Sequence, residues 1–395
     1  MQQQRHYFYS LNSMRFFFAL IVILIHVELY RGYIFEHTLL EKSKLLRDIG
    51  PVLVSFFFVI SGFLITYFLL SEKSKKETIS YRKFYKSRIL RIWPLYYLTI
   101  IIYWKVLPNL DILQQLHKDF FFVQQHATKH GMLLSENGYF TLSMLFLPQF
   151  TYAFAATIDM IATYATFTWS IGTEEFFYLF WPFVLNNSKN ERKGIQKVLI
   201  VYFSVYALCI LALGISKFIL HNGALSKLSS FAVFVMYLNR ISCMCIGGIG
   251  AYFVIHNMEQ LKQHCTVPRA WIATTLIVIL LVSGLFTQDI LSVLYMYVIL
   301  CIIVYAKPIP ILDNKILSYF GQVTYGVYMY HSMVIPLAYV LLKKYNMFNM
   351  ISFYVCSYVG TIIIAVLSYE FFEKPFLKLK DKPILSLITS KRNNI

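Results

Sequence analysis

The chain has 395 residues, of which 58% are hydrophobic and 14% are charged. Soluble domains are typically about 45–50% apolar and about 25% charged. This composition excludes a soluble enzyme, a disulfide-rich secreted scaffold and a disordered chain, and the long apolar runs along the whole sequence indicate a polytopic membrane protein.

The apolar runs predict an all-α bundle of about ten transmembrane helices, because each spanning helix needs roughly 20 apolar residues. The fourth run is the weakest, since Pro182 interrupts it and two glutamates stand at its start. The predicted spans are residues 14–31, 51–70, 92–108, 174–186, 198–220, 231–255, 271–287, 290–306, 322–342 and 350–372.

The net charge of +17 is concentrated in the short links between these runs. The link between the second and third spans carries eight basic and two acidic residues, so we expect it to be cytoplasmic. The even number of spans then places both termini in the cytoplasm. We expect residues 1–375 to form one domain in the plasma (inner) membrane and residues 376–395 to form a basic cytoplasmic tail. This pattern does not favour a nucleic-acid partner.

The first span contains Arg15 and His26, eleven residues apart. Eleven residues of an α-helix turn the chain about 20° beyond three full turns. Both side chains therefore lie on one face of the helix, about 16 Å apart along its axis. A charged residue within a spanning helix often marks a functional site. The alternative is an arginine that reaches the membrane interface and a histidine that only packs.

Arg88 and Arg91 lie at positions i and i+3, where the third span is expected to enter the membrane from the cytoplasm. Their guanidinium groups could bind phosphates in a bidentate manner. The alternative is an anchor that contacts lipid headgroups.

Two further clusters of polar residues adjoin apolar runs. The stretch from Trp169 to Pro182 includes Glu174 and Glu175, whose simplest alternative role is to cap a helix N-terminus. The stretch from Thr324 to His331 is the other cluster, and its simplest alternative role is to hold a buried histidine that bonds a hydroxyl. The six cysteines form no CxxC pair, so we expect neither a metal site nor a disulfide framework.

Six motifs, in order along the chain, resemble those of the membrane-bound acyltransferase-3 family, which acylates cell-surface carbohydrates. The family has Arg or Lys, ten residues and then His in its first helix, as Arg15 and His26 do here. Two of the matches are inexact: Ile171 stands in place of Leu in one, and Thr324 and Met329 stand in place of Ser and Leu in the other. The other motifs are Phe56 to Thr66 (S-G-F-L-I), Arg88 to Tyr97 (R-x-x-R before Pro), Trp169 to Pro182 (W-S-L-x-x-E-E), Thr324 to His331 and Glu373-Lys374-Pro375.

The resemblance implies a ten-helix fold that transfers an acyl group, most often acetyl from acetyl-CoA, to a hydroxyl of a carbohydrate or glycolipid. His26 would be the base or the nucleophile, and Glu174, expected at the same depth, would orient it. Arg15, Arg88 and Arg91 would hold the phosphates of the coenzyme. Side chains expected near the acceptor or behind the catalytic groups are Trp169, Ser170, Tyr178 and His331.

Two other classes of membrane protein are also considered. A secondary transporter or flippase would bury charges in broken helices, but the sequence has no internal repeat. A structural or regulatory membrane protein leaves the four polar clusters unexplained. Many members of the resembled family carry a hydrolase-like domain after the membrane part, and with 20 residues after Pro375 we expect none here.

Overall fold

The computed structural model describes residues 9–34, 39, 44–109, 136–148, 150, 168–305 and 309–381. Every secondary-structure element in these ranges is a helix, which confirms the all-α architecture. The first elements are α1 (Tyr9–Ile34), α3 (Lys44–Lys76), α4 (Tyr81–Ile101), the π-helix η1 (Ile102–Val106), the 3-10 helix η2 (Leu107–Asn109), α7 (Glu136–Met144) and α9 (Trp169–Asn187). They are followed by α10 (Glu191–Gly214), η4 (Ile215–Ile219), α11 (Gly223–Asn239), α12 (Ile241–His256), α13 (Met258–His264), α14 (Val267–Ser283), α15 (Gln288–Val304), α16 (Lys315–Lys344), α17 (Met350–Ser368), η5 (Tyr369–Glu373), α18 (Lys374–Lys378) and η6 (Leu379–Asp381).

Within the described residues, six helical segments are long and apolar enough to cross a bilayer. A seventh is obtained if α12 and α13, which meet at an angle of 109°, count as one span. The 17-residue helices α14 and α15 are apolar but shorter. The protein is therefore a polytopic membrane protein, and a helix lies at each of the ten positions expected from the sequence.

The predicted sixth span, 231–255, is divided into α11 and α12. Arg240 separates the two helices in a left-handed conformation, with φ 31° and ψ 37°. This conformation costs a non-glycine residue about 1–2 kcal/mol. It brings the buried guanidinium within 3.2 Å of the Ser55 hydroxyl, to which it donates, and within 5.2 Å of the centre of the Trp169 ring. The break thus keeps a charged side chain in the protein interior instead of in lipid.

Side-chain caps fix where several helices begin. In the described residues, a Ser, Asn or Thr oxygen accepts a hydrogen bond from a backbone N–H of the first turn in six helices. At the start of α17, Asn349 and Ser352 bond one another's backbone N–H groups and form a capping box. The six caps are Ser80, Asn190, Asn222, Thr287, Asn314 and Asn349.

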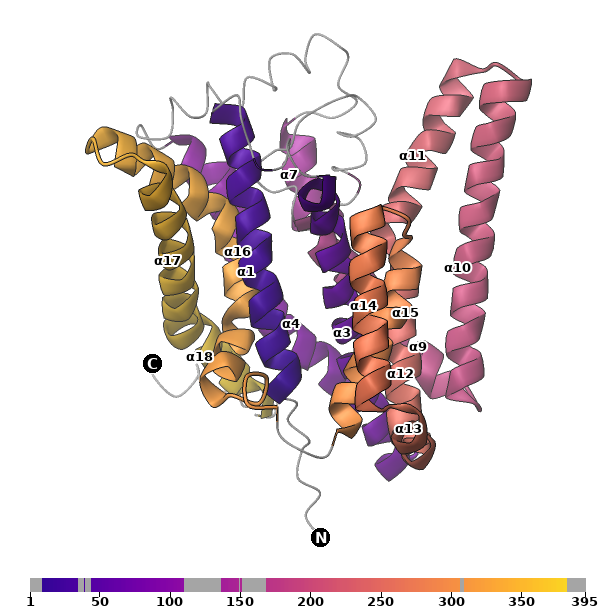
Figure 1. The fold of residues 1–395 in the computed structure, drawn as a ribbon. Coiled ribbons are helices and arrows are strands. Elements are labelled where there is room, and N and C mark those ends of the chain that lie inside the picture. The colour runs from indigo at the N-terminus through magenta and orange to yellow at the C-terminus, as the bar shows by residue number, and fades with distance from the viewer. Residues whose placement is uncertain are drawn as a thin grey trace, which may run out of the picture.

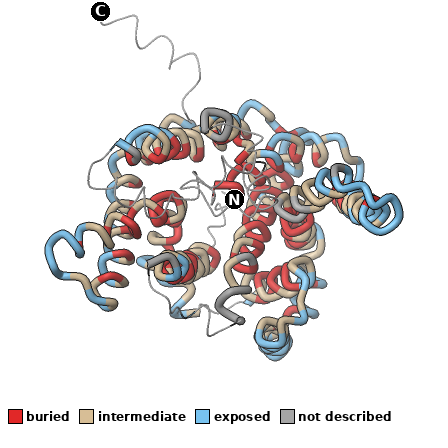
Figure 2. Tube along the Cα trace, turned by 90° about the horizontal axis from the view of Figure 1, so that it is seen from above, coloured by how far each residue is buried: buried red, intermediate tan, exposed pale blue. Residues whose placement is uncertain are grey.

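The long helices run approximately side by side (Figure 1). Helices α1, α16 and α17 form one group, and α3, α12, α14 and α15 form another, whereas the hairpin of α10 and α11 stands at the edge of the molecule. Viewed along the helices, buried residues face inward and most exposed residues lie on the outer rim (Figure 2). Exposed Leu208, Leu211 and Phe218 on the α10 side suit contact with lipid.

Glycines allow close contact between helices in both groups. A Cβ atom added at Gly62 of α3 would lie 2.0 Å from the carbonyl oxygen of Met244 in α12, and one at Gly247 would lie 2.1 Å from the carbonyl oxygen of Val59. Gly321 of α16 meets the backbone of α1 in the same way. Small residues at such contacts let membrane helices pack backbone to backbone. The glycine of the S-G-F-L-I motif thus joins α3 to α12.

We expect Gly62→Ala to destabilise the protein by about 1–3 kcal/mol, because the added methyl group meets a carbonyl oxygen that cannot move without shifting α12. The measurement is the thermal unfolding midpoint in detergent. Gly214→Ala in α10 is the control, since its Cβ would have no neighbour within 4 Å, and it should leave the midpoint unchanged or raise it. Equal effects of the two changes would contradict the proposed role of the close contact.

Candidate active site

A cavity of about 430 Å³ lies between α1, α3, α4, α9 and α16. The residues of α1 that line it extend from Leu11 to Ile23, a distance of about 18 Å along the helix axis. At the end near the start of α1, Leu377 of α18 and Lys380 of η6 complete the lining. At the other end, the lining includes His331 of α16. The cavity is therefore elongated along the helices.

The charged groups of this cavity are predominantly basic. Its lining includes Arg15 of α1, Arg88 and Arg91 of α4, and Lys380, against the single carboxylate of Glu174. Helix α4 begins at Tyr81, so Arg88 and Arg91 lie two to three turns inside it and face the cavity. That placement does not fit the alternative of an anchor in contact with lipid headgroups.

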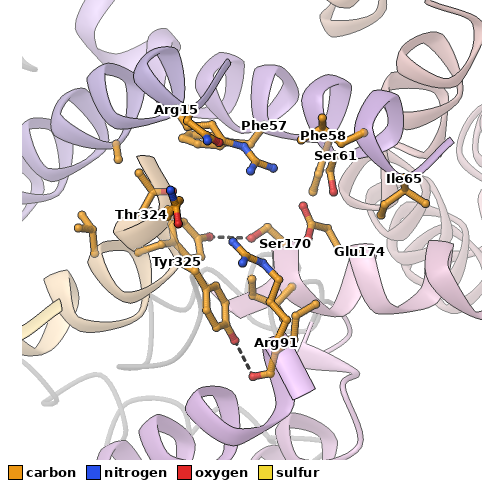
Figure 3. Close-up of a pocket in the computed structure, with 18 of the residues that line it drawn as sticks. Arg15, Phe57, Phe58, Ser61, Ile65, Arg91, Ser170, Glu174, Thr324 and Tyr325 are labelled. Carbon is orange, nitrogen blue, oxygen red and sulfur yellow. Dashed lines mark hydrogen bonds between the residues drawn. The ribbon is translucent and has the colours of Figure 1, made fainter. Parts of the chain in front are cut away.

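The arginines have few partners within the protein. Arg88 donates from Nε to the Ser87 hydroxyl at 3.4 Å, and its guanidinium lies 5.9 Å from the ring centre of Phe84 and 6.0 Å from that of Tyr178. Neither Arg15 nor Arg91 has an ion pair or hydrogen bond with any residue that the structure describes. Both point toward the space between α1, α4 and α9 (Figure 3). The arrangement suits an anionic ligand with several charges.

Glu174 lies at the arginine end of the cavity. Its carboxylate accepts a hydrogen bond of 2.7 Å from Tyr178, whose hydroxyl is also 2.9 Å from that of Ser61 in α3. It interacts electrostatically with Arg15 and Arg88 and points into the same space as the arginines (Figure 3).

The expected contact between Glu174 and His26 is not formed among the described residues. The sequence predicts Glu174 at the start of a span, level with His26. Helix α9 in fact begins at Trp169, five residues earlier, so Glu174 lies about 7.5 Å further along the helix, beyond its first turn. The alternative role in capping the helix N-terminus is excluded for the same reason. The neighbouring Glu175 also has no contact with His26 among the described residues, and it accepts a hydrogen bond from the Trp93 indole at 3.2 Å.

His26 and His331 meet at the opposite end of the cavity. Their ring centres are 4.5 Å apart and their planes are inclined by 75°. His26 Nδ1 donates to the Val22 carbonyl at 2.8 Å, and His331 Nδ1 donates to the Tyr328 carbonyl at 2.6 Å. His331 is fully buried, whereas His26 is partly exposed. The structure thus brings together two histidines that are 305 positions apart in the chain.

Ser170 and Tyr328 form a further part of the wall. Their hydroxyls are 2.7 Å apart, and the Tyr328 ring centre lies 5.7 Å from that of His331. Trp169 is buried behind Ser170, with its ring 6.0 Å from Phe58 and beneath the guanidinium of Arg240. Of the four side chains expected around the catalytic groups, Ser170, Tyr178 and His331 line the cavity, and Trp169 supports it from behind.

Three residues near the site were given no role in it from the sequence. Lys380 lines the cavity, although residues 376–395 were expected to form a separate tail, of which the structure describes the part up to Asp381. Glu373 is buried, and its carboxylate interacts electrostatically with Arg91. Arg240 is the one charged residue within the predicted span 231–255, a signal that could have been used. Among the described residues, no group of three His, Cys, Asp or Glu side chains is placed to bind a metal.

Comparison with known proteins relates the whole membrane part to one family. The acyltransferase domain of the acyltransferase-3 family matches residues 8–370. A candidate O-acetyltransferase of Staphylococcus aureus (strain COL) is 25% identical over 343 residues, and the peptidoglycan O-acetyltransferase OatA of Listeria monocytogenes is 25% identical over 344 residues. The candidate peptidoglycan O-acetyltransferase YrhL of Bacillus subtilis is 24% identical over 347 residues.

These alignments cover 82%, 83% and 82% of this chain but 52%, 51% and 50% of the respective relatives. The chain thus spans about half the length of the curated relatives that it matches. No solved structure matches the chain. The match over residues 8–370 includes α1, α3, α4, α9 and α16, which supply most of the cavity wall. The chain therefore belongs to the acyltransferase-3 family.

Proposed function

We propose that the protein is a membrane O-acyltransferase that moves an acetyl group from acetyl-CoA to a hydroxyl of a cell-envelope carbohydrate. The observation that carries this proposal is the polarity of the cavity. Four basic side chains and one carboxylate gather toward one end, and two imidazoles meet at the other. Acetyl-CoA is arranged in the same way, with its phosphates toward one end and its reactive thioester at the other.

The phosphates of the donor would be bound by Arg15, Arg88 and Arg91, which lack ion-pair partners among the described residues. The pantetheine arm would then extend along the apolar part of the lining, past Ala19 and Val22, toward the histidines. Glu174 would hold the arginines in position, because its carboxylate interacts with both Arg15 and Arg88. This role replaces the one expected from the sequence, in which Glu174 orients His26.

The transfer itself needs a base for the acceptor hydroxyl, or a nucleophile that carries the acetyl group. We propose that His26, in the family's first motif, takes part in this step. Its Nδ1–H bonds the Val22 carbonyl, which leaves the lone pair of the neutral ring on Nε2. The base takes the proton of the hydroxyl as the hydroxyl oxygen forms a bond to the acetyl carbon. The carbon–sulfur bond then breaks, and the leaving thiolate receives that proton.

The acceptor is proposed from the relatives. The name of OatA specifies peptidoglycan, so a hydroxyl of a cell-wall glycan or its lipid-linked precursor is the acceptor class to test first. We further propose that the protein lies in the plasma membrane, with the arginine end of the cavity and both termini on the cytoplasmic side, where acetyl-CoA is present.

A direct test uses purified protein in detergent with acetyl-CoA and glycan fragments. We expect release of the coenzyme thiol together with an ester-linked acetyl group on the glycan, detected by mass spectrometry. A transporter or flippase would release no thiol. Absence of both products with every cell-envelope glycan offered would overturn the proposed function.

The proposed orientation predicts opposite labelling of two engineered cysteines in intact cells. Lys76→Cys, at the end of α3, should not react with an impermeant thiol reagent applied from outside. Met347→Cys, in the link between α16 and α17 at the opposite end of the bundle, is 64% exposed and should react. Both variants are made in a chain whose six native cysteines are replaced by serine or alanine. The reverse labelling pattern would contradict the orientation.

A further inference from the structure

The contact between the imidazole rings of His26 and His331 is not explained by a role for His26 alone. Of the two, it is His331 that lines the cavity, whereas His26 lies one helical turn beyond the lining residue Val22. The thioester of a donor in this cavity would therefore reach His331 first. The contact of 4.5 Å between ring centres makes each histidine the immediate neighbour of the other.

The hydrogen bonds define which nitrogen of each ring is basic. A backbone carbonyl only accepts hydrogen bonds, so the Nδ1 atoms that contact the Val22 and Tyr328 carbonyls must carry the hydrogen. In the neutral form of each ring, Nε2 then holds the lone pair. Both histidines are thus set in the same tautomer, with the basic nitrogen directed away from its own helix backbone.

The surrounding residues hold this pair in a fixed geometry. Tyr103 of η1 donates to the Met329 carbonyl and lies 2.6 Å from the Ser332 hydroxyl, and Tyr30 of α1 donates to the Ser332 carbonyl. These bonds attach the turn of α16 that carries His331 to α1 and to the end of α4. A π-helix such as η1 often occurs at functional sites. The tertiary contacts therefore fix the distance between the two rings.

We propose that His26 and His331 act as one proton-holding pair, in which His331 is the catalytic residue that contacts the acceptor hydroxyl and His26 is a positioning residue that acts through it. This inference rests on the proposed function. Two imidazolium ions at this distance would repel strongly in a medium of low dielectric constant, so the pair holds a single extra proton. Neither histidine needs a carboxylate partner, which agrees with the position of Glu174 at the other end of the cavity.

In the transfer step, His331 Nε2 takes the proton of the acceptor hydroxyl while the hydroxyl oxygen attacks the acetyl carbon. The neutral ring of His26 stabilises the resulting imidazolium by ring contact. The carbon–sulfur bond then breaks, and the thiolate of the coenzyme receives the proton from the pair. The products are the acetyl ester and the free thiol, and the pair returns to its neutral state.

A double-mutant cycle of asparagine variants tests the pair. His26→Asn and His331→Asn keep an N–H donor near the position of Nδ1 but have no group at Nε2, so the hydrogen bonds to the two carbonyls can be retained. We expect each single variant to lose about 10²–10⁴-fold in kcat/KM for acetyl transfer and the double variant to lose no more than the worse single variant. His256→Ala, at the exposed end of α12, is the control and should keep wild-type activity.

The inference is overturned if His331→Asn keeps more than one-tenth of wild-type activity, or if the loss in the double variant equals the product of the single losses. His331→Gln, judged by the same limits, decides the question if the asparagine variants do not give a folded peak in size-exclusion chromatography. An inactive wild-type protein would instead refute the proposed function itself, so the two failures are distinguishable.

Discussion

Replacing His26 with alanine should lower the rate of acetyl transfer by about 10²–10⁴-fold, the usual cost of disabling general-base catalysis, because His331 loses the ring that positions it. The side chain makes one described hydrogen bond, to the Val22 carbonyl of its own helix, and one ring contact, to His331. Its removal should therefore change the thermal unfolding midpoint much less than the rate. The measurement is the release of coenzyme thiol by purified wild type and variant, with the glycan acceptor present.

His264→Ala provides the matched control for this loss. His264 ends α13, its side chain is exposed, and it does not line the cavity. Its replacement should leave both the rate and the unfolding midpoint unchanged. A His26→Ala protein that keeps more than half of the wild-type rate would remove His26 from the mechanism.

Arg88→Ala and Arg91→Ala should each weaken the binding of coenzyme A by roughly 10- to 150-fold. This range corresponds to the loss of about 1.5–3 kcal/mol, the usual contribution of a hydrogen bond to a charged group. Arg91 has no ion pair or hydrogen bond with any described residue, so its guanidinium is available to bind a phosphate directly. Titration calorimetry on the purified proteins measures the affinity directly.

Lysine variants separate phosphate binding from simple charge. Arg88→Lys keeps the charge but loses the planar guanidinium, which donates to two oxygens at once and lies over the rings of Phe84 and Tyr178. It should recover only part of the lost affinity. Arg82→Ala is the control, because Arg82 lies exposed on the same helix and outside the cavity. Unchanged affinity in both alanine variants at positions 88 and 91 would place the donor site elsewhere, with Arg15 the next residue to test.

The amino-acid sequence by itself determined the class of protein and the positions of its helices. Apolar runs of about 20 residues form helices in a membrane because each backbone group must be bonded within its own segment, and this requirement is local. Each of the ten apolar runs in the sequence accordingly contains a helix in the structure. The order of the motifs also identified the acyltransferase-3 family, and the i, i+3 spacing placed Arg88 and Arg91 on one side of α4.

Only the tertiary structure decided which polar side chains meet. The break at Arg240 depends on Ser55 and Trp169, which belong to other helices. The contact of His26 with His331 depends on the packing of α1 against α16 through Gly321. The depth of Glu174 depends on where α9 begins, and a shift of five residues moved it from the histidines to the arginines. Helical periodicity fixes the face on which a side chain lies, but the axial position of one helix against another is set by packing between segments far apart in the chain.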